Sequence, residues 1–101
     1  MTIIPEYGAP MASGGNQTAL NLSSTTVVKT GPGRVASVSV IVPAAAICTI
    51  NDCATTGAVA NSNAVFAIPA SATGNFPINF PCFAGITVAP GAGVTLAINF
   101  A

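Results

Sequence analysis

Charged residues are the scarcest feature of this chain. Lysine, arginine, aspartate and glutamate make up 4% of its 101 residues, whereas an average soluble domain contains roughly 25%. The four charged residues are Glu6, Lys29, Arg34 and Asp52, so Ser, Thr, Asn, Gly and Ala must cover most of the surface. Such a surface favours burial against neighbouring subunits, and we expect an oligomer. Hydroxyl and amide groups can also keep a monomeric extracellular β-protein in solution, and that alternative stays open.

Histidine is also absent, which removes the side chain that most often transfers protons in enzymes. The two carboxylates, Glu6 and Asp52, lie in different predicted segments, and nothing in the pattern arranges them as a catalytic pair. A serine nucleophile would lack its usual base, and no Gly-x-Ser-x-Gly motif occurs. We therefore expect no enzyme activity, no catalytic residues, no cofactor and no metal site.

The chain lacks a basic patch and a long apolar run. Its formal net charge is zero, so we expect no nucleic-acid binding, which needs cations to neutralise phosphates. Residues 35–50 are apolar overall, but Ser37, Ser39 and Pro43 interrupt them, and the stretch is shorter than the ~20 residues of a spanning helix. The first residues lack a basic start followed by a continuous apolar stretch. We expect neither membrane insertion nor Sec-type export.

Residues 1–24 show no regular period. They are rich in Gly, Pro, Ser, Asn and Thr, with isolated apolar residues between them. This composition predicts an extended N-terminal arm, either disordered or laid across another subunit. The apolar residues of the arm that we expect to contact another chain are Ile3, Ile4, Tyr7, Leu20 and Leu22.

Residues 25–101 show the alternation of β-strands. Apolar residues recur at every second position between turns rich in Gly and Pro. About seven short strands are expected, at residues 25–30, 34–42, 46–51, 64–68, 76–82, 85–89 and 94–100. With no helical period, this pattern predicts one all-β domain over residues 25–101, a β-sandwich or a jelly-roll-like barrel.

Two local signals refine this expectation. The sequence Gly31-Pro32-Gly33 predicts a tight turn, and we expect it to join the first two strands as a hairpin. Pro77 and Pro81 cannot donate ladder hydrogen bonds, so they predict an edge strand or an irregular crossing. The side chains that we expect in the core are Val38, Val40, Phe66, Ile68, Ile78, Phe80, Val88, Leu96 and Ile98.

The remaining reactive groups are the thiols of Cys48, Cys53 and Cys82. Without histidine, three thiols at these spacings do not resemble a zinc site. Buried, reduced cysteines acting as small hydrophobic residues are one interpretation. The other is a Cys48–Cys53 disulfide across the end of a strand, or a bridge between subunits through Cys82, since an odd count leaves one thiol over.

Several short patterns, none of them catalytic, resemble a known group of proteins. They are Lys29-Thr30-Gly31-Pro32-Gly33-Arg34-Val35, Thr49-Ile50-Asn51-Asp52, Ala54-Thr55-Thr56-Gly57-Ala58, Ile68-Pro69-Ala70, Phe80-Pro81 and Gly85-Ile86-Thr87-Val88. Across residues 25–100 the chain resembles small all-β virion proteins of tailed bacteriophages, which decorate the capsid or form the base of a head or neck fibre. The resemblance implies a β-sandwich module, often trimeric, attached to a protein shell.

These expectations combine into one hypothesis about function. We expect a non-enzymatic virion protein that decorates or cements a phage head, assembled in the cytoplasm of the bacterial host. Its partners would be further copies of itself, a trimer by the resemblance, and the major capsid protein or another virion protein. Lys29, Arg34 and Asp52 are the candidate contact residues of the domain.

Two other classes stay open. One is a neck, head-fibre or tail-fibre base module with an adhesive role. The other is a small inhibitor or carbohydrate-binding domain, which usually needs a stacking aromatic residue, and the absence of tryptophan weighs against it.

Overall fold

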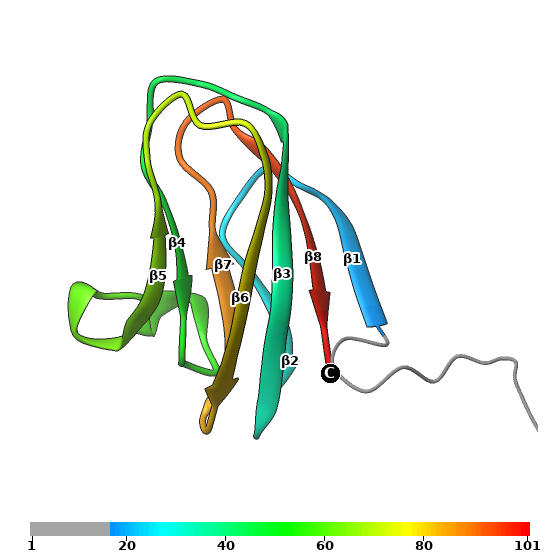
Figure 1. The fold of residues 1–101 in the computed structure, drawn as a ribbon. Coiled ribbons are helices and arrows are strands. Elements are labelled where there is room, and N and C mark those ends of the chain that lie inside the picture. The colour runs from blue at the N-terminus through cyan, green and yellow to red at the C-terminus, as the bar shows by residue number, and fades with distance from the viewer. Residues whose placement is uncertain (1–16) are drawn as a thin grey trace, which may run out of the picture.

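The computed structural model describes residues 17–101. These residues form eight strands in two four-stranded sheets packed face to face (Figure 1). Neighbouring strands run antiparallel. The first sheet has the order β1-β8-β3-β6, made of β1 (Gln17–Leu22), β8 (Thr95–Phe100), β3 (Gly33–Val42) and β6 (Gly74–Cys82). The second has the order β2-β7-β4-β5, made of β2 (Thr26–Thr30), β7 (Gly85–Ala89), β4 (Cys48–Asn51) and β5 (Ala64–Ile68).

Successive strands mostly alternate between the two sheets. Among the described strands, β4 and β5 are the one successive pair that shares a sheet. This is the strand order of an eight-stranded jelly roll, and within residues 17–101 the sheets do not close into a barrel. The prediction of a single all-β sandwich is confirmed. Because strands cross between sheets, the connections gather at the two ends of the sandwich (Figure 1).

The predicted boundary of the arm is corrected. The prediction placed residues 1–24 in the arm, but Gln17–Leu22 form β1, which pairs with β8. Ala19 lies opposite Ile98 and Leu22 opposite Leu96, with a register shift between them, and Leu22 is buried. Residues 1–16, including Ile3, Ile4, Glu6 and Tyr7, lie outside the described residues.

The expected hairpin at Gly31-Pro32-Gly33 is also corrected. The turn is present, but it carries the chain from β2 in the second sheet to β3 in the first. Gly31 has φ +80°, a conformation that glycine adopts without steric cost. A Cβ on Gly33 would lie 2.6 Å from the carbonyl oxygen of Ala101, so the close approach of two backbones requires glycine there. Local turn chemistry therefore fixed the bend but not the strand that follows.

Strand β3 contains an irregularity that the alternating pattern did not reveal. Its register shifts between Val35 and Ser37 against both of its neighbours, β6 and β8. An extra residue at this place reverses which face later side chains occupy. Val35 and Val38 are both buried for this reason, although they are three positions apart and would face opposite sides of a regular strand. Beyond Val40 the strand extends past the core, and Val42 is exposed.

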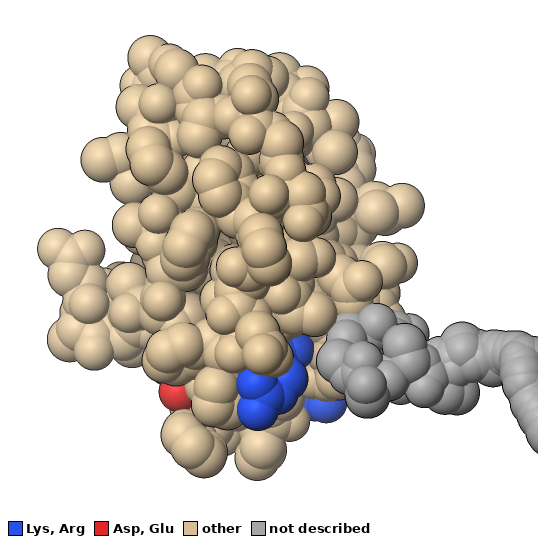
Figure 2. Space-filling view, viewed as in Figure 1, with Lys and Arg blue, Asp and Glu red and all other residues tan. Residues whose placement is uncertain are grey.

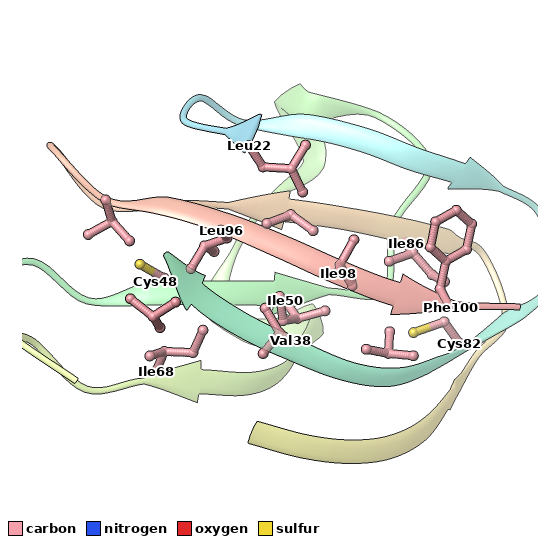
Figure 3. Packing of buried hydrophobic residues seen from close by; sticks show 14 residues of the cluster. Leu22, Val38, Cys48, Ile50, Ile68, Cys82, Ile86, Leu96, Ile98 and Phe100 are labelled. Carbon is pink, nitrogen blue, oxygen red and sulfur yellow. The ribbon is translucent and has the colours of Figure 1, made fainter. Parts of the chain in front are cut away.

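The core lies between the two sheets, where side chains of β8 and β3 meet those of β4 and β7 (Figure 3). Six of the nine predicted core residues are buried, which confirms the prediction for Val38, Val40, Ile68, Val88, Leu96 and Ile98. Phe66 and Ile78 are partly buried and pack against the core. Phe80 is 43% exposed, so its prediction as a core residue is wrong. It lies on the edge strand β6, where few neighbours can cover a large ring.

The long connection between β4 and β5 is held down by a buried amide. It contains two short 3₁₀ helices, η2 (Thr56–Ala58) and η3 (Asn61–Asn63). Asn51 Nδ2 donates hydrogen bonds to the carbonyl oxygen of Ala60 at 3.0 Å and to Asn63 Oδ1 at 2.8 Å, and Asn51 Oδ1 accepts one from Thr49 Oγ1 at 2.8 Å. A buried amide with these partners costs little to desolvate. Asn51 therefore has a structural role.

The assignment of β8 can be tested at its centre. Leu96→Ala should lower the free energy of unfolding by about 2–5 kcal/mol, because it leaves a cavity in a close-packed core. The matched control is Thr95→Ala, which removes a partly exposed side chain from the other face of β8 and should change stability by less than about 0.5 kcal/mol. Urea unfolding measures both. Equal losses for the two variants would contradict the assigned faces of the strand.

The corrected boundary of the arm can be tested by two truncations. Removing residues 1–16 leaves all eight described strands and the buried Leu22 in place, so it should lower Tm less than the longer truncation does. Removing residues 1–24 deletes β1 and the buried Leu22. That loss should lower Tm by at least about 10 °C, since a buried leucine contributes about 2–5 kcal/mol and 1 kcal/mol shifts Tm by roughly 4–8 °C. Equal Tm values at the same protein concentration would contradict the placement of β1.

Candidate functional site

All charged side chains of residues 17–101 lie at one end of the sandwich. Lys29 is near the end of β2, Arg34 is at the start of β3, and Asp52 follows β4. Figure 2 shows their blue and red atoms close together at this end, with uncharged residues over the rest of the visible surface. We call this surface, together with Phe80 and Phe83, the charged end. The structure thus brings together the three domain residues that the sequence singled out.

Asp52 organises the turn between β6 and β7. Its Oδ1 accepts hydrogen bonds from the backbone nitrogens of Phe83 at 3.0 Å, Ala84 at 2.8 Å and Gly85 at 3.3 Å, and its Oδ2 lies 3.1 Å from the nitrogen of Phe83. The hydrogen bond from Phe83 is the main reason that the pKa of the Asp52 carboxyl lies below its ordinary value of 3.8, against a smaller opposing effect of desolvation. At neutral pH this carboxylate is ionised and fixes the backbone of the turn.

The packing around this turn is tight. Gly31 donates a backbone hydrogen bond of 2.9 Å to the carbonyl oxygen of Ala84, which joins the β2–β3 turn to the β6–β7 turn. A Cβ on Gly85 would lie 2.7 Å from the carbonyl oxygens of both Cys53 and Lys29. The backbones of three connections therefore meet with no space for another atom. The charged end is a preformed surface.

Arg34 lies along β6. Its Nη1 donates hydrogen bonds to Asn79 Oδ1 at 2.9 Å and to the carbonyl oxygen of Asn79 at 3.2 Å. Asn79 has φ +52°, which asparagine tolerates better than most residues. These partners are neutral, so the positive charge of Arg34 is held in place and is not neutralised by them.

Two phenylalanines are exposed beside these charges. Phe83 is 76% exposed on the β6–β7 turn, and Phe80 lies near the end of β6. The sequence analysis did not single out Phe83, although its position just after an expected edge strand was an available signal. Because Asp52 holds the backbone nitrogen of Phe83, the chain keeps an aromatic side chain in solvent on a fixed support.

The three cysteines are free and buried. Cys48 begins β4, and Cys53 follows its end. The two residues are therefore at opposite ends of β4, and neither forms a disulfide in this structure. The structure does not show the predicted Cys48–Cys53 bridge. The interpretation as small buried hydrophobic residues fits all three positions.

Cys82 has the most perturbed thiol. The pKa of the Cys82 thiol is raised to about 11, mainly by burial and to a smaller extent by the nearby Asp52 carboxylate and Cys53. At neutral pH the thiol is protonated and a poor nucleophile. Cys82 is also buried in the core, so a bridge to another subunit through this residue would require the end of β6 to move.

The outer face of the first sheet contains a shallow groove of about 230 Å³. Short hydroxyl and amide side chains line it, among them Ser37, Ser39, Asn75 and Asn99, with the exposed Leu20 at one side. Asn75 Nδ2 donates a hydrogen bond of 2.8 Å to Ser39 Oγ. Asn99 Oδ1 is buried and has no hydrogen-bond partner within the described part of the chain. The groove is uncharged and has both polar and apolar groups in its lining, and it was not predicted from the sequence.

Within residues 17–101, no group of three His, Cys, Asp or Glu side chains is placed to hold a metal ion. No helix in this part is long and apolar enough to span a membrane.

The two predicted contact residues of the arm that the structure describes differ in exposure. Leu22 is buried in the domain's own core, which corrects its prediction as a contact to another chain, and Leu20 is exposed.

The role of Asp52 can be tested by its pH dependence. Asp52→Asn should lower the free energy of unfolding at pH 7 by about 1 kcal/mol, a value kept small because water screens this partly exposed group. The pKa of Asp52 is lower in the folded protein than its ordinary value of 3.8, so the ionised carboxylate stabilises the fold fully at pH values above 3.8. This stabilisation is lost as the pH falls through the lower pKa of the folded state. The stability difference between the two proteins should therefore shrink below about pH 3.8. A difference that does not depend on pH would show that the charge of Asp52 is not involved.

Comparisons of this chain with protein-family models, with curated proteins and with solved structures find no match.

Proposed function

We propose that this chain is a structural protein of a tailed-phage virion, in the role of a decoration or cement protein that binds the outside of the head. The observation that carries this proposal is the placement of charge. Three charged side chains sit together at one end of residues 17–101, and the remaining described surface is uncharged. A protein locked between neighbours does not need charge over its surface to stay soluble.

The two ends of the sandwich differ in a way that supports contacts on more than one side. The charged end presents Phe80 and Phe83 beside two cations. The opposite end presents Ile41, Val42 and Ile47 around the β3–β4 connection. Copies that contact several neighbours at once stabilise a particle because dissociation must break all of the interfaces together. The sequence resemblance to phage virion proteins supports the same role.

The proposal is tested on the particle itself. Imaging of purified particles should locate many copies of this chain on the outside of the head. Particles assembled without it should release their DNA at a lower temperature than complete particles do, and adding back the purified chain should restore the difference. Absence of the chain from purified particles, or equal thermal release with and without it, would overturn the proposal.

The groove on the first sheet favours a second candidate, the base module of a fibre with an adhesive role. The lining includes hydroxyl and amide side chains, and Asn99 Oδ1 there has no hydrogen-bond partner among residues 17–101. These groups suit the hydroxyl groups of a neutral sugar better than they suit an ion. Titration with neutral oligosaccharides tests this candidate. Binding that is lost in Asn99→Ala and kept in Ile47→Ser would support it over the cement role.

A further inference from the structure

The charged end exposes the kind of surface that proteins bury on binding. Phe83 is among the most exposed large hydrophobic residues of the described chain, and Arg34 and Lys29 lie at the same end. Aromatic residues and arginine are enriched where interfaces bind most strongly. The hydrogen bonds from the turn to Asp52 hold Phe83 in advance, so less conformational freedom is lost when a partner covers it.

We propose that this surface binds the N-terminal segment Ile3-Ile4-Pro5-Glu6-Tyr7 of the same kind of chain. In this arrangement the Glu6 carboxylate faces Lys29 and Arg34, and the apolar side chains of the segment cover Phe83. The inference concerns the isolated protein and does not depend on the role in a virion.

Charge complementarity selects this occupant. The two cations of the whole chain are Lys29 and Arg34, and its two acids are Asp52 and Glu6. Asp52 is committed to the β6–β7 turn, where three backbone N–H groups donate to it, whereas the hydrogen bonds of Arg34 go to a neutral residue. Glu6 is therefore the acidic side chain of this sequence that is left to pair with Lys29 and Arg34.

The sequence around Glu6 matches the rest of the surface. Ile3, Ile4 and Tyr7 flank Glu6 in the sequence with apolar side chains, and the exposed Phe83 lies at the same end of the sandwich as the two cations. A charge pair with apolar contacts on both sides is better protected from water than an exposed pair, and it contributes more to the free energy of binding for that reason.

The segment is within reach. The described chain begins at Gln17, opposite Phe100, and Phe100 lies opposite Val35, the neighbour of Arg34. The start of β1 is thus two strand spacings, about 10 Å, from β3. The nine residues from Gly8 to Asn16 can span up to about 30 Å, which allows the segment to reach the charged end of its own copy or of a second copy.

The test uses an intrinsic probe. Tyr7 is the one tyrosine of the chain and tryptophan is absent, so tyrosine emission reports the segment alone. Acrylamide quenching of the full-length chain should be weaker than quenching of a synthetic peptide of residues 1–16. Arg34→Glu, Phe83→Ser and Glu6→Arg should each raise quenching toward the value of the free peptide. The double variant Glu6→Arg with Arg34→Glu should restore the protection, because it exchanges the two charges.

Ile47→Ser is the matched control, since it removes a residue that is 63% exposed at the opposite end of the sandwich and should leave the quenching unchanged. Circular dichroism shows that each variant is folded. Protection that grows with protein concentration assigns the contact to a second copy, and constant protection assigns it to the same copy. The inference would be overturned if Tyr7 were as accessible to acrylamide as in the free peptide at every protein concentration. It would also be overturned if the charge exchange did not restore the protection of Tyr7. Neither result would affect the location of the chain in a particle, so the two proposals fail separately.

Discussion

The apolar contact between the two sheets is the interaction on which the rest of this structure depends. Strands β8 and β3 supply its first face, and β4 and β7 supply the second (Figure 3). Because successive strands cross from one sheet to the other, forming this contact also gathers the connections at the two ends. The positions of Lys29, Arg34 and Asp52 follow from that crossing, since each lies beside a connection at the same end.

With so few charges, each one has a distinct local effect. Asp52 supplies one acceptor group to three backbone N–H groups at the β6–β7 turn, and it is ionised at neutral pH because those N–H donors favour the charged form. Arg34 is positioned along β6 by Asn79. The same contacts that hold the end of the sandwich together therefore also fix the groups that a partner would meet.

The sequence predicts the seven strands after residue 25 because their inward side chains are large and alternate regularly. Strand β1 escaped prediction because Leu22 is its one fully buried residue and Asn21, at φ +58°, interrupts its regular conformation. Phe80 lies opposite the buried Val35, yet its edge strand leaves it uncovered. The contact between Asp52 and Phe83 joins residues 31 positions apart. No local pattern encodes such a contact, which depends on how the two sheets pack.

The two candidate binding surfaces differ in what they can select. The groove offers neutral donors and acceptors that water also satisfies, so a ligand there gains mainly from the placement of several weak bonds. The charged end offers an aromatic side chain on a backbone held by Asp52, at the same end as the two cations, so a partner there gains from burying apolar area and from pairing charge at once. Removal of Phe83 or reversal of Arg34 should therefore separate the two contributions at the charged end, because salt weakens the second and leaves the first largely intact.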